Sequence, residues 1–252
     1  GFMAAGVEAG DRVALMSTTR YEWTLTDLAL LTCGAVVVPI YETSSSDQVA
    51  WILADSEAVA VVVENQEMAL TVSQVRERCP HLRDVWQIDA GHLDELLEGA
   101  PEVSDAQMRA RRDAVDADHV ATIIYTSGTT GFPKGATLSH HNILNNGYFV
   151  GELIRYTEAD RICIPVPFYH CFGMVMGNLA ATSHGACMVI PAPSFEPAAT
   201  LRAVVDERCT SLYGVPTMFI AELGLRDFAD YDLSSLRTGI MAGSTCPVEV
   251  MK

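Results

Sequence analysis

The sequence is short of positive charge and of long apolar runs. Its 252 residues contain 16 lysines and arginines against 32 aspartates and glutamates, and the formal net charge is −16. A surface this acidic repels nucleic-acid phosphates and anionic lipid headgroups, so we expect neither as a partner. The longest apolar stretch, residues 28–40, is too short to span a bilayer and is interrupted by Gly34 and Pro39. The first fifteen residues lack the pattern of a signal peptide. These absences predict a cytoplasmic protein with no stable membrane insertion.

Patterns of disulfide and zinc sites are lacking as well. The cysteine count is odd, no C-x-x-C pair occurs, and no group of cysteines and histidines has zinc-ligand spacing. We therefore expect reduced thiols, mostly buried in the core. The seven are Cys33, Cys79, Cys163, Cys171, Cys187, Cys209 and Cys246. Internal repeats and low-complexity segments are absent too.

Strand-like and helix-like segments alternate along the chain. Residues 35–40, 58–63 and 119–125 are nearly continuous apolar runs, as expected for strands buried on both faces. A capping box at residues 45–48 predicts the start of a helix between the first two runs. The predicted fold class is α/β, with largely parallel β-sheets layered with helices. An apolar content of 49% is enough for a large core.

A polar stretch at residues 99–118 interrupts this alternation. We interpret it as a surface helix with loops, in which Arg109, Arg111 and Arg112 form a solvated face. It is also the predicted seam between a first α/β subdomain, residues 1–115, and a second subdomain, residues 116–252, that carries the loop described next.

Residues 125–135 read YTSGTTGFPKG. The glycines allow close backbone approach to a ligand, free N–H groups and hydroxyls can donate to an anion, and a lysine supplies positive charge. The stretch is not a Walker loop, because Pro133 precedes Lys134 and Gly135 follows it where Ser or Thr should stand. A plain glycine-rich hairpin turn is the alternative, but the density of donors favours a loop that holds a pyrophosphate or triphosphate.

This stretch resembles the signature of the adenylate-forming enzymes, a family of acyl- and aryl-CoA synthetases, luciferases and peptide-synthetase adenylation domains. Segments 33–41, 165–173, 213–217 and 239–244 resemble further family motifs in the same order. The resemblance implies the front part of the family's large N-terminal domain. Residues 39–46 are most similar to bacterial long-chain fatty acyl-CoA synthetases.

The resemblance implies a site for ATP and Mg²⁺. Three residues would be catalytic: Lys134 as a mobile cation on the phosphates, His170 beside the acyl carboxylate, and Thr129, whose hydroxyl suits a magnesium contact. The residues implied in nucleotide binding are Thr126, Ser127, Gly128, Thr129, Thr130, Gly131, Lys134, Ala242, Gly243 and Ser244. The last three would flank adenine.

An apolar acyl pocket is implied too, because each buried methylene contributes about 0.8 kcal/mol. Its candidates are Phe172, Met174, Val175, Val215, Pro216 and Met218. For each of them a plain core role is the alternative.

The implied activity is ATP-dependent conversion of a fatty acid to acyl-AMP with release of pyrophosphate, followed by transfer to coenzyme A. Family motifs for the ribose, for magnesium and for the C-terminal catalytic lysine do not occur in these 252 residues. We therefore expect the activity from a full-length parent and expect the chain alone to be inactive. Two alternatives stay open: a fatty acyl-AMP ligase that loads a carrier protein, and a non-catalytic nucleotide-binding remnant. Acyl chain length and oligomeric state do not follow from the sequence.

Overall fold

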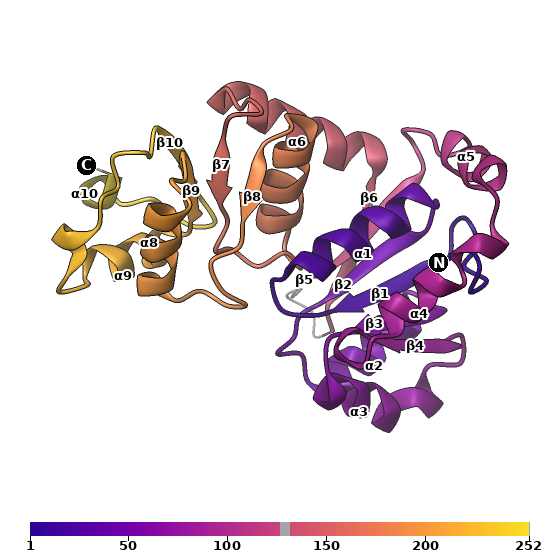
Figure 1. The fold of residues 1–252 in the computed structure, drawn as a ribbon. Coiled ribbons are helices and arrows are strands. Elements are labelled where there is room, and N and C mark those ends of the chain that lie inside the picture. Colours follow the sequence, from indigo (N-terminus) through magenta and orange to yellow (C-terminus); the bar gives the residue numbers. More distant parts are fainter. Residues whose placement is uncertain (127–131, 252) are drawn as a thin grey trace. The chain divides into compact units, whose positions relative to one another are not determined.

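The computed structural model describes residues 1–126 and 132–251, and the chain divides into two compact units. The first comprises Gly1–Thr18 and Glu22–Ile143, and the second comprises Thr19–Tyr21 and Leu144–Lys252. Both consist of largely parallel strands alternating with helices (Figure 1), so the predicted α/β class is confirmed.

The first unit is built on a six-stranded sheet of order β4-β3-β1-β2-β5-β6. All neighbouring strands are parallel except β5 and β6, which form an antiparallel hairpin. The strands are β1 (Arg12–Met16), β2 (Val36–Ile40), β3 (Ala60–Val63), β4 (Asp84–Gln87), β5 (Val120–Thr126) and β6 (Lys134–Ser139).

The central strands of this sheet are buried on both faces. In β2 and β3 every residue is buried, which explains why their sequences are unbroken apolar runs. Alternate residues point to opposite faces, and the face that carries Met16, Ile40 and Val63 packs against two helices. These are α2 (Ser46–Asp55) and α3 (Gln66–Val75).

Local sequence signals set where these helices begin. The predicted capping box is confirmed: the Ser45 hydroxyl accepts from the Gln48 N–H, and the Gln48 side chain accepts from the Ser45 N–H. The other helices of this unit are α1 (Tyr21–Thr32), α4 (His92–Glu98), α5 (Asp105–Asp113) and the short 3₁₀ turns η1 (Arg76–Arg78), η2 (Ile88–Ala90) and η3 (Ala100–Glu102).

The arginine face of α5 differs from the prediction at one position. Arg109 and Arg112 are exposed, as expected for a solvated face. Arg111 instead donates to the carbonyls of Val7 and Cys33 and pairs with Glu8 at 2.8 Å. Its guanidinium therefore ties α5 to the chain around β1 and β2, because its five donors can satisfy several carbonyls at once.

The second unit has a four-stranded parallel sheet of order β10-β9-β7-β8. Its strands are β7 (Arg161–Cys163), β8 (Cys187–Val189), β9 (Ser211–Gly214) and β10 (Thr238–Met241). A π-helix, η4 (Phe172–Leu179), runs directly into α7 (Ala180–Ser183). The remaining helices are α8 (Pro197–Asp206), α9 (Pro216–Leu223), α10 (Val248–Met251) and the turn η5 (Phe228–Asp230).

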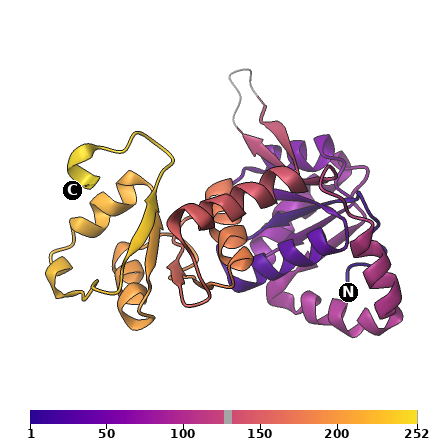
Figure 2. The same ribbon diagram turned by 90° about the horizontal axis from the view of Figure 1, so that it is seen from above.

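The hairpin of β5 and β6 belongs to the first unit. Its register pairs Thr126 with Lys134 and Tyr125 with Gly135. Figure 2 shows the paired ends of the two strands standing out from the helices of this unit. The two units part between Ile143 and Leu144, inside α6 (His140–Ile154), and not at the predicted seam 115/116, because the hairpin completes the first sheet.

All seven cysteines are free thiols, as predicted. Four of them are buried, whereas Cys171 and Cys187 are exposed and Cys246 is partly exposed, so the expected burial holds only in part. In the part of the chain that the structure describes, no helix combines the length and apolarity that a bilayer crossing requires.

Candidate functional site

In the second unit the predicted site residues follow the carboxyl ends of parallel strands. Val215 comes directly after β9 and Ala242 directly after β10, and His170 lies on the connection that leaves β7. Ligands of open α/β sheets bind at this edge. Residues far apart in the sequence are thereby brought to one edge of one sheet.

In the first unit the predicted phosphate residues that the structure describes face each other across a hairpin. Thr126 ends β5, Lys134 begins β6, and both side chains are exposed. A hydroxyl donor thus stands opposite an ammonium group, as anion binding requires. Ser127, Gly128, Thr129, Thr130 and Gly131 lie outside the described residues, so their predicted roles, including the magnesium contact of Thr129, stay predictions.

His170 is held as a neutral donor. Its Nδ1 accepts from the backbone N–H of Phe172 at 3.1 Å, which leaves the proton of the neutral ring on Nε2. The His170 side chain is exposed, but the protein atoms around the ring displace part of its hydration, and this desolvation lowers the pKa of the imidazole below its usual value. At neutral pH the ring therefore offers an Nε2–H donor to a ligand without adding a charge.

The loop that carries His170 is fixed on both sides. A Cβ on Gly173 would lie 2.3 Å from the Pro167 carbonyl oxygen, so the first turn of η4 packs directly on the loop backbone. The Phe168 N–H donates to the Thr19 hydroxyl at 3.4 Å, and the Thr19 N–H donates to the Pro193 carbonyl at 3.1 Å. Thr19 thus joins two loops of this unit.

The turn after β10 has the predicted small residues in a close-packed conformation. The Ala242 N–H donates to the Gly214 carbonyl at 3.2 Å and continues the pairing of β10 with β9. Gly243 has φ = +91°, and a Cβ there would lie 3.0 Å from Cγ1 of Val215. Ser244 is exposed. The turn predicted to flank adenine therefore contacts a residue predicted to line the acyl pocket.

The six acyl-pocket candidates occupy two elements. Phe172, Met174 and Val175 are buried on η4, where the Phe172 ring stacks on Tyr213 of β9 with centroids 5.7 Å apart. On the other element, Val215 and Met218 are partly exposed and Pro216 is buried at the start of α9. The structure thus places η4 against the strand that leads to Val215, while the binding roles stay predictions.

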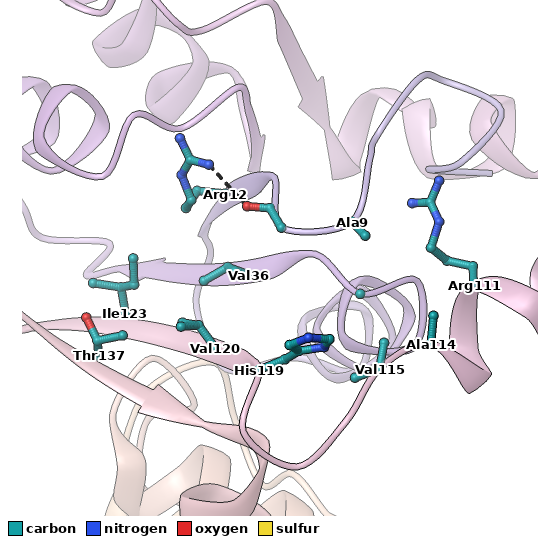
Figure 3. Close-up of a pocket in the computed structure, with 12 residues that line it drawn as sticks. Ala9, Arg12, Val36, Arg111, Ala114, Val115, His119, Val120, Ile123 and Thr137 are labelled. Atoms are coloured by element: carbon teal, nitrogen blue, oxygen red, sulfur yellow. Dashed lines mark hydrogen bonds between the residues drawn. The ribbon is translucent and has the colours of Figure 1, made fainter.

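A separate apolar pocket of about 400 Å³ lies in the first unit (Figure 3). It is lined by Gly10, Gly34 and His119, which precede β1, β2 and β5, so it opens at the amino ends of these strands. Arg12, which also lines it, donates to the Gly10 carbonyl at 3.1 Å. None of the predicted site residues lines this pocket, and it is not the carboxyl edge where α/β ligands bind.

Magnesium ligands are not gathered in the described ranges 1–126 and 132–251, where no group of three or more His, Cys, Asp or Glu side chains could hold a metal ion. The one predicted ligand, Thr129, lies outside those ranges.

Residues that sequence reasoning missed support the predicted ones. On α2, Asp55 contacts Tyr125 of β5 and Trp51 contacts Pro133, which directly precedes β6. Thr19 holds the loop before His170. Trp51 and Asp55 are four residues apart and so share one face of α2, but no motif marks their partners 70 or more residues away. No sequence signal could have identified these contacts.

The sheets of both units are largely parallel, and the predicted site residues that the structure describes lie at strand ends, as in ligand-binding α/β proteins. The family model described as AMP-binding enzyme matches residues 1–252, and the chain belongs to this family of adenylate-forming enzymes. The match covers the whole chain, so the resemblance predicted from the motifs is confirmed.

Relatives at the sequence level are named as acyl-CoA synthetases and ligases. The chain is 41% identical to the putative acyl-CoA synthetase YngI of Bacillus subtilis, covering 100% of this chain and 50% of that protein. It is 37% identical to the mitochondrial medium-chain acyl-CoA ligase ACSF2 of Danio rerio, covering 100% of this chain and 46% of that protein. The chain therefore spans about half the length of these relatives.

Solved structures show the same fold. The N-terminal domain of FACL13 from Mycobacterium tuberculosis superposes with a TM-score of 0.80 at 22% identity, over 99% of this chain and 61% of that one. The anthranilate CoA ligase AuaEII, solved with anthranoyl-AMP, gives a TM-score of 0.82 at 24% identity, over 99% of this chain and 47% of that one. The predicted likeness to the N-terminal domain of adenylate-forming enzymes is confirmed at the level of fold.

Proposed function

We propose that this chain supplies nucleotide and acyl contacts to an enzyme that activates a fatty acid with ATP and transfers it to coenzyme A. The cross-strand pair of Thr126 and Lys134, in a member of the AMP-binding family, carries the proposal. The names of the sequence relatives support the acyl-CoA ligase assignment.

The first step is an in-line attack of a carboxylate oxygen on the α-phosphorus of ATP, with pyrophosphate as the leaving group. Both reactants are anions, so the protein must neutralise charge and hold geometry. Lys134 would pair with the phosphates, and the Thr126 hydroxyl would donate to a phosphate oxygen. No general base is needed, because the carboxylate is already ionised. Mg²⁺, when bound, would spread the phosphate charge.

His170 would act on the acyl side of the reaction. Its Nε2–H would donate to the carboxylate and then to the mixed anhydride. A neutral ring suits both species, because it binds the anion without holding it so tightly that attack is slowed. Ala242, Gly243 and Ser244 would flank adenine, and Phe172, Met174, Val175, Val215, Pro216 and Met218 would line the acyl chain.

Acyl chain length and the acyl acceptor can each be decided by one experiment. The motif at residues 39–46 favours long-chain acids, whereas the Danio rerio relative is named a medium-chain ligase. A panel of C6 to C18 acids decides the length. A requirement for coenzyme A in product formation separates a CoA ligase from a ligase that loads a carrier protein.

Pyrophosphate release tests the proposal. The full-length protein that contains this chain should release pyrophosphate from ATP only when a fatty acid is present. Lys134→Ala should weaken ATP binding, with Arg109→Ala as a matched control because Arg109 is an exposed cation of the same unit outside the site. A full-length protein that released no pyrophosphate with any carboxylate would be a non-catalytic nucleotide-binding remnant.

A further inference from the structure

One helix of the first unit, α2, contacts β5 and the two residues that directly precede β6 in the β5–β6 hairpin. On the outgoing strand side, the Trp51 indole N–H of α2 donates to the Pro133 carbonyl at 2.9 Å. The same indole stacks on the Phe132 ring, with centroids 4.6 Å apart and planes inclined by 20°. Pro133 directly precedes Lys134, so Trp51 fixes the backbone that leads into the lysine.

The incoming strand is held by the next turn of the same helix. The Tyr125 hydroxyl donates to the Asp55 carboxylate at 2.6 Å, and Tyr125 directly precedes Thr126. Burial, and then the bond to Asp55, raises the pKa of Tyr125 far above its usual value, so the hydroxyl keeps its proton. Asp55 lies in the last turn of α2, where the helix dipole disfavours a negative charge, so helix stability does not explain its presence.

Packing joins the two strands at the same level. Gly135 lies opposite Tyr125 in the hairpin register. A Cβ on Gly135 would lie 2.6 Å from the Ile123 side chain and 3.2 Å from Cζ of Tyr125. Because Gly135 has no side chain, β6 can pack directly on the Tyr125 ring. Tyr125 is held by Asp55, so this one hydrogen bond restrains both strands.

We propose that Trp51 and Asp55 are positioning residues that set the separation and direction of Thr126 and Lys134 for the phosphates of ATP. The two side chains are one helical turn apart on α2, so one rigid element fixes both ends of the hairpin. This inference rests on the proposed function, because it assigns the phosphates to Thr126 and Lys134.

Steady-state kinetics of the full-length enzyme tests the inference. Trp51→Ala removes one hydrogen bond and one aromatic stack and should raise the KM for ATP roughly tenfold, with the KM for fatty acid within about twofold of wild type. Trp51→Phe keeps a stacking ring and should raise it only about threefold. Asp55→Ala should also raise the KM for ATP, and Asp55→Asn should restore it, because the amide oxygen still accepts from Tyr125.

Trp86→Phe is the matched control for Trp51→Phe. Trp86 lies on β4 of the same unit and contacts Phe2, so this change should leave both KM values unaltered. Equal rises in both KM values, or a KM for ATP that does not change in Trp51→Ala, would overturn the positioning role. If Trp51→Ala does not fold, the KM for ATP of Trp51→Phe against Trp86→Phe, and of Asp55→Ala against Asp55→Asn, gives the same decision: no difference within either pair would overturn the role. A wild-type enzyme without pyrophosphate release would instead reject the proposed function itself.

Discussion

Asp27 should make the first unit less stable as the pH rises. This residue of α1 is 1% exposed, and neither carboxylate oxygen has a hydrogen-bond partner among the described residues. Burial raises its pKa from 3.8 to about 7. The folded state therefore binds the proton more tightly than the unfolded state, and the stability present at low pH is lost as the pH rises toward 7.

The size of the effect follows from the two pKa values. Between pH 5 and about pH 7 only the folded state holds the Asp27 proton, and over these roughly 2 pH units the unfolding free energy falls by about 3 kcal/mol. Asp27→Asn cannot ionise, so its free energy of unfolding should lack this contribution. Asp27→Asn keeps the size of the side chain, and its amide also lacks hydrogen-bond partners. Compared with wild type, the variant should therefore be equally or less stable at pH 5 and more stable at pH 8.

Urea unfolding followed by tryptophan fluorescence measures this difference. All three tryptophans, Trp23, Trp51 and Trp86, belong to the first unit, so the signal follows the unit that contains Asp27. The quantity to compare is the change in unfolding free energy between wild type and Asp27→Asn at each pH. The same difference at pH 5 and pH 8 would refute the reasoning, because it would mean that Asp27 titrates alike in both states.

Three further changes have defined outcomes. Gly173→Ala should lower kcat/KM for the fatty acid roughly tenfold or more, because its Cβ would lie 2.3 Å from the Pro167 carbonyl and displace the His170 loop; unchanged kinetics would contradict this. Ser45→Ala should cost about 1 kcal/mol in urea unfolding through loss of the α2 cap, and no loss would remove the cap's role. His170→Gln should retain more acyl-AMP formation than His170→Ala, because an amide N–H can replace Nε2–H; equal losses would exclude a donor role.

Much of the fold could be predicted because the parallel strands are buried on both faces. Unbroken apolar runs such as those of β2 and β3 read directly as strands, and the Ser45 cap marked the start of α2. The seam at 115/116 could not be placed correctly, since a polar surface helix looks like a linker. Only pairing with the sheet shows that the β5–β6 hairpin belongs before the boundary.

The functional residues likewise fall into a group that the sequence identifies and a group that it does not. Lys134, His170 and the Ala242–Ser244 turn follow local motifs, so the sequence could identify them. Three supporting residues act through contacts with residues up to 104 positions away: Arg111, Trp51 and Asp55. No local motif around them indicates those partners. Such supporting contacts depend on tertiary packing, which a single sequence does not specify.

The direct test of adenylate formation is the fate of the carboxylate oxygen. The full-length enzyme is given a fatty acid labelled with ¹⁸O in both carboxylate positions, together with ATP and coenzyme A, and the nucleotide product is analysed by mass spectrometry. Attack on the α-phosphorus followed by transfer to the thiol leaves one ¹⁸O in AMP and none in pyrophosphate. Formation of ADP with labelled phosphate would show γ-phosphoryl transfer instead and would contradict the account.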